Sequence, residues 1–361
     1  MNLTSFDLYR YSLPLSRPLT LKGATLRRRE GLLLRLSGDD GSEGWGETTP
    51  LPGFSEESFE QATVQLRRLA RTLVGLQVTD HWIDQDGMFG RDLERIAPAP
   101  SVWFGLELAV WSLYAASSGK SLPELVTPQP RATVPVNGLL SGPLDGVPGE
   151  ARRMRDAGYE AVKLKVGART VAEDVRLVRT LVEELGDAIS LRLDANRAWS
   201  YEEAAGFVRG APRFEYVEEP LADPSRLPDL VREFAVAVAL DESLVGMEPE
   251  ELEEHGYARA VVLKPTLLGG ISRTLRMAEH ALRLGMTPVL SSSYESGVGT
   301  AALVALAAGI GERPVPAGLD TYRALAGDVL DTPLALPVPS VDVGETAVAS
   351  RRVEVSRLEN P

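Results

Sequence analysis

The stretch Ala161-Val-Lys-Leu-Lys165 opens a series of six short apolar runs, each of which ends in a residue fit for chemistry. The other runs are Leu191-Arg-Leu-Asp194, Tyr216-Val-Glu218, Val238-Ala-Leu-Asp241, Val261-Val-Leu-Lys264 and Pro288-Val-Leu-Ser291. Their last residues lie 29, 24, 23, 23 and 27 positions apart, which is the length that a strand and a return helix need. Parallel strands of this kind end on one side of the sheet, so the six polar residues are predicted to surround one mouth.

The same alternation predicts eight strands in total. They cover 134–140, 161–166, 190–195, 214–219, 237–242, 259–264, 286–292 and 315–319, and helical patterns fill the gaps at 170–185, 201–209, 246–254 and 271–284. The runs are short and rich in Val and Leu, as in parallel strands covered on both faces. A doubly wound open sheet is the competing α/β architecture, but eight strands with polar ends favour a modified TIM-type (β/α) barrel over 106–324.

The first part of the chain has a different pattern. Segments 5–13 and 25–37 are typical of strands, and 55–76 is typical of a helix, so we expect an α+β capping domain over 1–105. The tail 325–361 has no further repeat and is expected to pack back on this domain. Between the strands and the helix, Gly44-Trp-Gly-Glu-Thr-Thr-Pro-Leu-Pro-Gly53 is interpreted as a shaped loop, either a lid or a plain surface connection.

Composition excludes several classes of function. The chain of 361 residues has a formal net charge of −13 and no cysteine. Disulfides and thiolate sites are therefore excluded, and nucleic acid and anionic membranes are unfavourable partners. The three histidines fall away from the predicted strand ends, which argues against a histidine triad or zinc site. No signal peptide or membrane span is recognisable, so we expect a cytoplasmic protein; its oligomeric state is left open.

Three carboxylates, Asp194, Glu218 and Asp241, end successive predicted strands. Oxygen ligands without His or Cys suit Mg²⁺ better than zinc or copper. The alternative is that each carboxylate starts the following helix as an N-cap, but three at regular steps favour a metal. Two residues flank Asp194 on its own face: Asn196, which is expected to support a metal ligand, and Arg192, which either pairs with an acidic residue or reaches a substrate.

Lys163 and Lys165 are two apart on one predicted strand and so share a face. If that face is the barrel interior, burial and mutual repulsion lower their pKa values toward the range of a general base. If it is a solvated edge, they are ordinary surface lysines. Lys264 enters from the far side of the ring, so the lysines could act on opposite faces of a substrate, or one of them could only stabilise charge.

The segment Ser291-Ser-Ser-Tyr-Glu-Ser-Gly-Val-Gly299 ends the seventh predicted strand and opens a helix. Its glycines come too late after the strand for a dinucleotide-binding motif. A helix start with free N–H groups and serines, Ser291 and Ser293 among them, is instead suited to a substrate carboxylate. Gly318 ends the neighbouring strand, where barrels often bind anions. The site therefore suits a small dianionic carboxylate.

Taken together, these residues resemble the enolase superfamily in its muconate-lactonising subgroup. The resemblance rests on Lys163-x-Lys165, Asp194-x-Asn196, Glu218-Glu-Pro220, Asp241-Glu-Ser243 and Lys264-Pro265. It implies a capping domain over a modified barrel, one Mg²⁺ ion, and removal of a proton α to a carboxylate; lysine bases with a metal-stabilised enediolate are the pattern of this superfamily.

Within that subgroup the chain is similar to the o-succinylbenzoate synthase family. The shared phrases include Pro50-Leu-Pro-Gly-Phe54, Leu191-Arg-Leu-Asp-Ala-Asn-Arg-Ala-Trp199, Ser291-Ser-Ser-x-Glu-Ser296 and Gly318-Leu-Asp-Thr321. This resemblance implies dehydration of a cyclohexadiene carboxylate, with Lys165 as proton carrier, Lys264 stabilising the enediolate, and Ser291 and Gly318 holding a succinyl carboxylate. N-acylamino-acid racemases and dipeptide epimerases are the close alternative. The epimerases typically carry Asp-x-Asp after the last strand, whereas this chain has Asp320-Thr-Tyr322.

Overall fold

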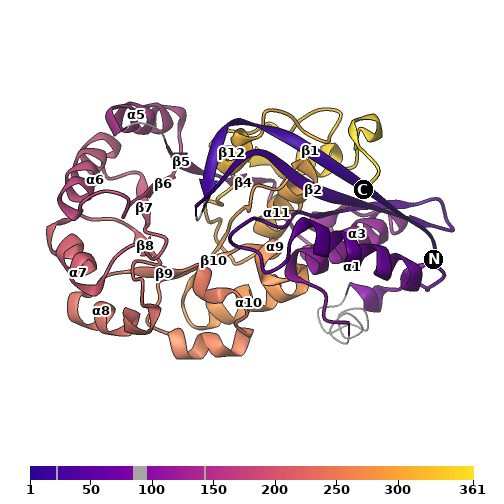
Figure 1. The fold of residues 1–361 in the computed structure, drawn as a ribbon, viewed down its shortest axis with the longest axis horizontal. Helices are drawn as coiled ribbons and strands as arrows, with labels where there is room; N and C mark the ends of the chain where they lie inside the picture. Colours follow the sequence, from indigo (N-terminus) through magenta and orange to yellow (C-terminus); the bar gives the residue numbers. More distant parts are fainter. Residues whose placement is uncertain (22, 84–95, 142–143) are drawn as a thin grey trace.

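The computed structural model describes residues 1–21, 23–83, 96–141 and 144–361. A three-stranded antiparallel sheet with its helices forms one end of the molecule, and a parallel sheet surrounded by helices forms the other (Figure 1). This arrangement confirms the α/β fold predicted from the sequence.

The capping sheet consists of β1 (Leu3–Leu21), β2 (Ala24–Gly38) and β3 (Glu43–Thr48), in that order. Both predicted strands are present and longer than expected. The prediction of a loop from Gly44 onward is wrong, because 44–48 belong to β3. Its glycines permit close packing on α3 (Pro100–Ser117): a Cβ on Gly46 would lie 2.0 Å from the Gly105 carbonyl oxygen. Gly44 and Gly46 therefore serve packing here and do not mark a turn.

Two helices cover the capping sheet. α1 (Phe59–Leu73) begins at a capping box in which Ser58 and Gln61 each bond the other's main chain. Such reciprocal bonds satisfy amide groups that the first turn leaves free. α3 is apolar on nearly all sides and is buried between the capping sheet and the barrel. The helix predicted at 55–76 is thus confirmed as the shorter Phe59–Leu73.

The barrel sheet contains seven parallel strands in the order β11-β10-β9-β8-β7-β6-β5. Their bounds are β5 Asn137–Leu140, β6 Ala161–Lys165, β7 Ser190–Asp194, β8 Tyr216–Glu218, β9 Val238–Leu240, β10 Ala260–Leu263 and β11 Thr287–Leu290. Because neighbours in sequence are also neighbours in the sheet, residues that end successive strands lie next to each other. Lys165 pairs with Asp194, and Asp194 pairs with Glu218.

Helices cover the outside of these strands (Figure 1). The helices after α3 are α4 Leu122–Val126, α5 Val147–Ala157, α6 Val171–Leu185, α7 Tyr201–Gly210, α8 Leu227–Phe234, α9 Pro265–Leu268, α10 Ile271–Arg283, α11 Gly297–Gly309 and α12 Val343–Ala349. Of these, α9 packs on α3, and α4 and α12 pack on α11. Short 3₁₀ helices are η1 Asp80–Trp82, η2 Leu144–Gly146, η3 Pro224–Arg226, η4 Glu242–Leu244, η5 Pro249–His255, η6 Asp320–Ala324 and η7 Val355–Arg357. The helix predicted at 246–254 is therefore a 3₁₀ segment, shifted toward its C-terminal side.

The eighth predicted strand, 315–319, is reduced to two bridges that close the ring. Ala317 pairs with Val136, and Gly318 pairs with Ser291, both in parallel. The Ala317 amide donates to the Pro135 carbonyl and the Gly318 amide to the Leu290 carbonyl, each at 2.8 Å. Pro316 has no N–H to donate, so this segment can make only a short ladder.

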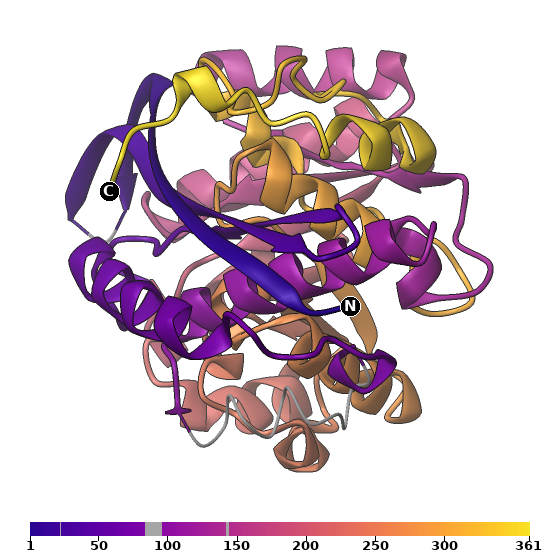
Figure 2. The same cartoon turned by 90° about the vertical axis from the view of Figure 1, so that its right-hand side faces the viewer.

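The tail contacts both parts of the molecule. Leu325 forms a bridge with Leu15, and Glu359 forms one with Arg10, so both ends of the tail lie along β1 (Figure 2). Between them, β12 (Ser340–Asp342) pairs antiparallel with β4 (Thr133–Pro135) at the start of the barrel. The tail therefore packs on the capping domain, as expected, and also pairs with the start of the barrel, so it connects the two.

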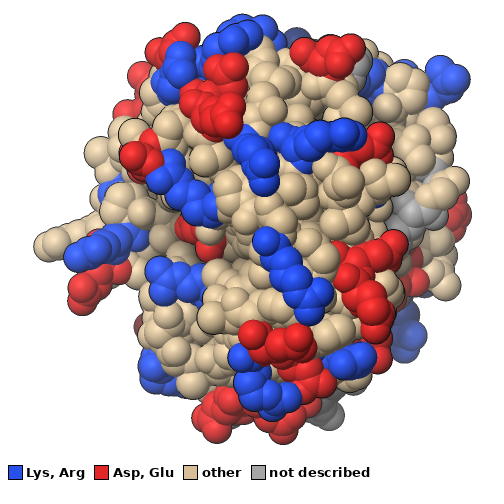
Figure 3. Space-filling model, turned by 90° about the vertical axis from the view of Figure 1, so that its left-hand side faces the viewer, with Lys and Arg blue, Asp and Glu red and all other residues tan. Residues whose placement is uncertain are grey.

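Charge is mixed on the outer end of the barrel. Figure 3 shows Lys and Arg interspersed with Asp and Glu over this face, without one continuous basic area. None of the helices in the described part of the chain has both the length and the apolar character needed to cross a bilayer.

Candidate active site

Three carboxylates stand at the C-terminal ends of adjacent barrel strands. Asp194 ends β7, Glu218 ends β8, and Asp241 directly follows β9. They are only 3%, 2% and 4% exposed. Parallel pairing places them here: Asp194 pairs with Glu218, and Glu218 pairs with Ala239, two residues before Asp241. Three buried carboxylates in one place require compensating positive charge.

Lysine side chains supply that charge in this structure. The Lys163 Nζ lies 2.9 Å from Asp194 Oδ2 and also donates to Glu218 Oε2. Lys264 donates to Asp241 Oδ2. Among the described residues, no group of three or more acidic, histidine or cysteine side chains is arranged to hold a metal ion, so the metal site at Asp194, Glu218 and Asp241 stays a prediction.

The electrostatics of the carboxylates nevertheless favour a cation. Burial raises the pKa of Glu218 to about 7; Lys163 opposes this rise, and the Asp194 and Asp241 carboxylates add to it. The donor set is oxygen only, with no His or Cys near it in the described residues. Such hard donors suit Mg²⁺. The three side chains therefore fit the expected ion by their chemistry, and each of them forms an ion pair with Lys163 or Lys264.

Lys163 and Lys165 have different environments although they lie on one strand. Burial alone would lower the pKa of Lys163, but the Asp194 and Glu218 carboxylates outweigh this effect and raise it well above its usual value. The prediction of a lowered pKa is therefore wrong for Lys163. Burial and a neighbouring lysine lower the pKa, but two carboxylates from β7 and β8 raise it by more. Lys165 reaches the more open mouth and donates to Asn196 Oδ1 at 2.8 Å.

Asn196 connects this lysine to the carboxylates. It has a left-handed backbone with φ 43°, and its amide donates to Asp194 Oδ1 at 3.0 Å. Its side-chain nitrogen donates to Glu242 Oε1 at 3.1 Å. Glu242 was not among the predicted site residues, and its other oxygen is buried without a hydrogen-bond partner. The sequence signals for it are its place directly after Asp241 and its membership of the motif Asp241-Glu-Ser243.

Arg192 is not at the mouth. It is 2% exposed, its Nε donates to Glu215 Oε2 at 2.7 Å, and its Nη1 donates to the Pro316 carbonyl at 2.7 Å. It does not line the cavity that contains the lysines. The prediction of substrate binding is therefore corrected: Arg192 lies a layer deeper and pairs with an acidic neighbour, which was the other interpretation of the sequence.

One cavity brings most of the remaining candidates together, although Glu218 and Asp241 do not line it. Its barrel side includes Lys163, Lys165, Asp194, Asn196, Lys264, Ser291, Ser293 and Gly318. The capping domain contributes Leu21, Leu51 and Phe54. The end of the predicted lid thus reaches the mouth, but Trp45 does not; it lies 5.7 Å from Tyr9, ring centre to ring centre, and lines a separate cavity beside α3.

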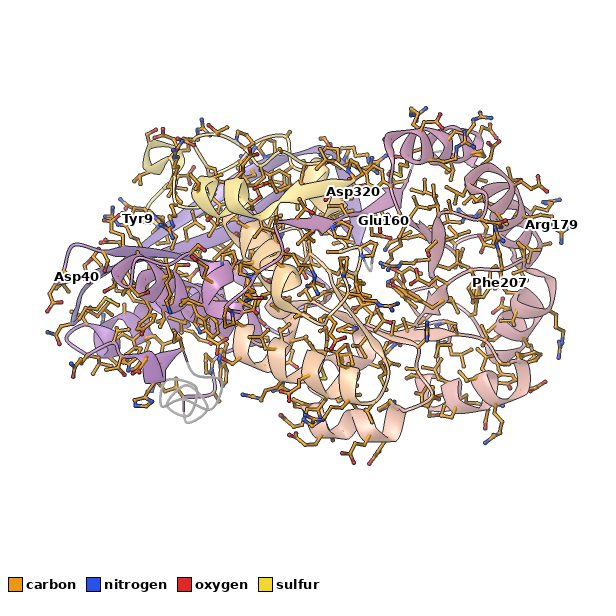
Figure 4. The ribbon with its side chains drawn as sticks, turned by 180° about the vertical axis from the view of Figure 1, so that it is seen from behind. Tyr9, Asp40, Glu160, Arg179, Phe207 and Asp320 are labelled. Atoms are coloured by element: carbon orange, nitrogen blue, oxygen red, sulfur yellow. The ribbon has the colours of Figure 1, made fainter. Side chains whose placement is uncertain are left out.

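The cavity also has residues that the sequence did not single out. They are Asn137, Leu139, Ser292, Tyr294, Asp320 and Thr321. Asn137 and Leu139 are two apart on a predicted strand, which is a signal that they share a face. Asp320 lies near the middle of the molecule, between the capping strands and the barrel (Figure 4). Its Oδ2 accepts from the Leu139 amide at 2.7 Å, and burial raises its pKa to about 6.

Two family models match this chain. Residues 147–347 match the enolase C-terminal domain-like family, and residues 3–113 match the MenC N-terminal domain. Among solved structures, the L-Ala-D/L-Glu epimerase from Bacillus subtilis superposes with a TM-score of 0.84 and 22% identity, over 95% of this chain and 96% of that one. A muconate lactonizing enzyme from Pseudomonas fluorescens, complexed with muconolactone, gives 0.83 and 25%, over 95% and 94%. The first likeness shows the fold alone.

Curated relatives are more similar in sequence. The o-succinylbenzoate synthase of Pasteurella multocida is 33% identical over 94% of both chains. That of Haemophilus influenzae is 34% identical over 94% of this chain and 96% of its own. The alignments therefore run from the cap through the barrel. On these grounds the chain belongs to the o-succinylbenzoate synthase family of the enolase superfamily.

Proposed function

We propose that this protein is a Mg²⁺-dependent o-succinylbenzoate synthase of menaquinone biosynthesis, a hydro-lyase. It would dehydrate 2-succinyl-6-hydroxy-2,4-cyclohexadiene-1-carboxylate to 2-succinylbenzoate. The observation that carries this proposal is a single cavity lined by Lys165 and Lys264 beside buried carboxylates. Part of its wall is the turn 291–296, called here the serine turn. Membership of the family gives the reaction; the cavity offers groups for each part of it.

The metal would be held by Asp194, Glu218 and Asp241. When bound, Mg²⁺ supplies positive charge that stabilises negative charge developing on the substrate carboxylate. Asn196, whose amide donates to Asp194 Oδ1, would keep that carboxylate oriented. Glu219 would help to orient Asp241 in a similar way, because the Glu219 Oε1 accepts from the Asp241 amide at 3.0 Å.

Lys165 is proposed as the proton carrier. Its neutral amine takes the proton from C1, the carbon that bears the carboxylate. The resulting ammonium returns that proton to the hydroxyl on C6, the C6–O bond breaks, and water leaves as the ring becomes aromatic. The hydrogen bond from Lys165 Nζ to Asn196 Oδ1 would aim the lysine at the mouth. Lys264 stays protonated on the opposite face and stabilises the enediolate.

The second carboxylate of the substrate is proposed to bind at the serine side of the cavity. Ser293 has a buried hydroxyl without a partner, and Ser291 lies beside Gly318, where a Cβ would come within 2.6 Å of the serine Oγ. Hydroxyl and amide donors close to a helix start favour an anion. Leu51 and Phe54 would cover the apolar ring between the two carboxylates.

The direct test is turnover of the cyclohexadiene substrate by the purified protein, followed by loss of diene absorbance and by identification of 2-succinylbenzoate. We expect saturable turnover that needs Mg²⁺. Absence of product at high enzyme concentration with Mg²⁺ present would overturn the proposal.

A racemase of N-succinylamino acids is the second candidate. The observation that favours it is the presence of two lysines in one cavity, since racemisation needs a proton carrier on each face. Incubation with an N-succinylamino acid in D₂O, followed by NMR of the α-proton, would detect it. Robust epimerisation of dipeptides without dehydration would replace the synthase assignment, whereas weak racemisation would be a second activity of the same site.

A further inference from the structure

Arg29 is a buried arginine of the capping domain, and all its hydrogen bonds among the described residues go to main-chain oxygens. It lies on β2 and is 2% exposed. Its Nη1 donates to the Pro50 carbonyl at 2.7 Å, and its Nη2 donates to the Thr49 carbonyl at 2.5 Å. None of the ion pairs among the described residues includes it. A buried charge without a carboxylate is costly unless several dipoles replace the lost water.

The same guanidinium reaches across to the barrel. Its Nε donates to the Tyr294 carbonyl at 3.2 Å, and its Nη2 donates to the Ser293 carbonyl at 3.3 Å. Ser293 and Tyr294 line the substrate cavity, and Thr49 and Pro50 directly precede Leu51, which lines it from the cap. One planar group with five N–H donors therefore joins two walls of the cavity, a span that suits arginine.

The barrel segment that it holds is strained. Tyr294 has φ 63°, which is uncommon for a residue with a bulky side chain. Such a backbone persists only where its surroundings fix it. On the other side of this turn, Glu47 of β3 accepts from the Ser296 amide at 2.8 Å and from the Gly299 amide at 2.7 Å. The cap thus presents a cation to the carbonyls of the turn and a carboxylate to its amides.

We propose that Arg29 is a positioning residue for substrate binding, which fixes the serine turn 291–296 against the lid segment 49–54. This inference rests on the proposed function for its substrate. It adds that binding of the remote carboxylate depends on a cap residue that does not itself touch the cavity. Without the guanidinium, Ser293 and Tyr294 lose two of the donors that hold their strained backbone, and the wall of the cavity loosens.

The test compares Arg29→Met with Arg28→Met, the exposed neighbour on β2, whose side chain donates to Ser12. We expect Arg29→Met to raise KM by about 10-fold or more with a smaller change in kcat, since a remote binding contact is misplaced. Hydrogen exchange should rise in a peptide covering 289–297 and stay unchanged in β6–β8. Arg29→Lys should give an intermediate KM, because one ammonium keeps the charge but cannot span both walls.

Several outcomes would overturn the proposal: unchanged exchange at 289–297, raised exchange with unchanged KM, or equal effects of Arg29→Met and Arg28→Met. If Arg29→Met does not fold, Arg29→Lys decides the question by the same two measurements. If Arg29→Lys has the KM and the hydrogen exchange of the wild type, the proposed role of the planar guanidinium is contradicted. If the wild-type protein does not turn over the diene, the proposed function fails, and the exchange measurement still decides whether Arg29 holds the turn.

Discussion

The two sides of the cavity are built in different ways. On the carboxylate side, Asp194, Glu218 and Asp241 end or directly follow consecutive strands, each paired in parallel with the next. On the serine side, the decisive contacts join residues far apart in the chain: Arg29 with Ser293, and Glu47 with Ser296, 264 and 249 positions away. The first side is a product of repetition, and the second is a product of how the cap docks on the barrel. Chemistry is therefore proposed for the first side and recognition for the second.

Metal removal tests the carboxylate side alone. It should have the largest effect, because the proposed Mg²⁺ ion supplies the positive charge that stabilises the developing negative charge. We expect EDTA to reduce turnover to the uncatalysed background and added Mg²⁺ to restore it. Calorimetric titration should show weaker Mg²⁺ binding by Asp241→Asn but not by Asp229→Asn, a control at a half-exposed aspartate that pairs with Arg232. Full activity in EDTA would show that the three carboxylates serve only their lysine partners.

Replacement of Lys165 should have the second largest effect on turnover. We expect Lys165→Ala to lower kcat by about 10²–10⁴-fold with the fold intact, because the proton carrier is lost. Stopped assays at saturating substrate measure kcat, and circular dichroism measures whether the fold is intact. Lys120→Ala, at an exposed lysine outside the cavity, is the matched control. A variant at Lys165 with a near-normal rate would place the base elsewhere.

A smaller effect is expected from the serine side. A Cβ on Gly318 would lie 2.6 Å from Ser291 Oγ, so Gly318→Ala must displace the serine. We expect KM to rise by about 10-fold with little change in kcat, as for loss of a uniform binding contact. Gly327→Ala has open space around the added carbon and should behave as wild type. A fall in kcat alone would mean that the two sides are not separate in function.

The smallest effect should come from the lid. Phe54 lines the cavity from the cap, and its truncation removes part of an apolar contact with the substrate ring. We expect Phe54→Ala to raise KM about 2- to 5-fold, from roughly 0.5–1 kcal/mol of lost contact. Val64→Ala, at a residue 65% exposed on α1, controls for surface change. An unchanged KM would indicate that the segment 49–54 does not cover bound substrate.

The sequence by itself determined the barrel and the position of its polar strand ends. Spacing of 23 to 29 residues is enough, because each strand–helix unit places the next strand beside the last and brings Lys165, Asp194, Glu218, Asp241 and Lys264 to one end. A local period of this kind survives in the sequence as a pattern. The sequence also predicted the limits of the helices at 170–185 and 271–284 to within one residue, whereas the helix predicted from 55 begins only after its N-cap at Ser58.

Only the tertiary structure decided which of these side chains meet. Lys163 pairs with two carboxylates while Lys165 bonds Asn196, and Arg192 pairs with Glu215 below the mouth. Their distances depend on side-chain direction and on charges brought by other strands, which spacing does not contain. The closure of the ring by Ala317 and Gly318 and the hold of Arg29 on the serine turn depend on segments distant in sequence. Such contacts form only when whole elements pack, so no local pattern records them.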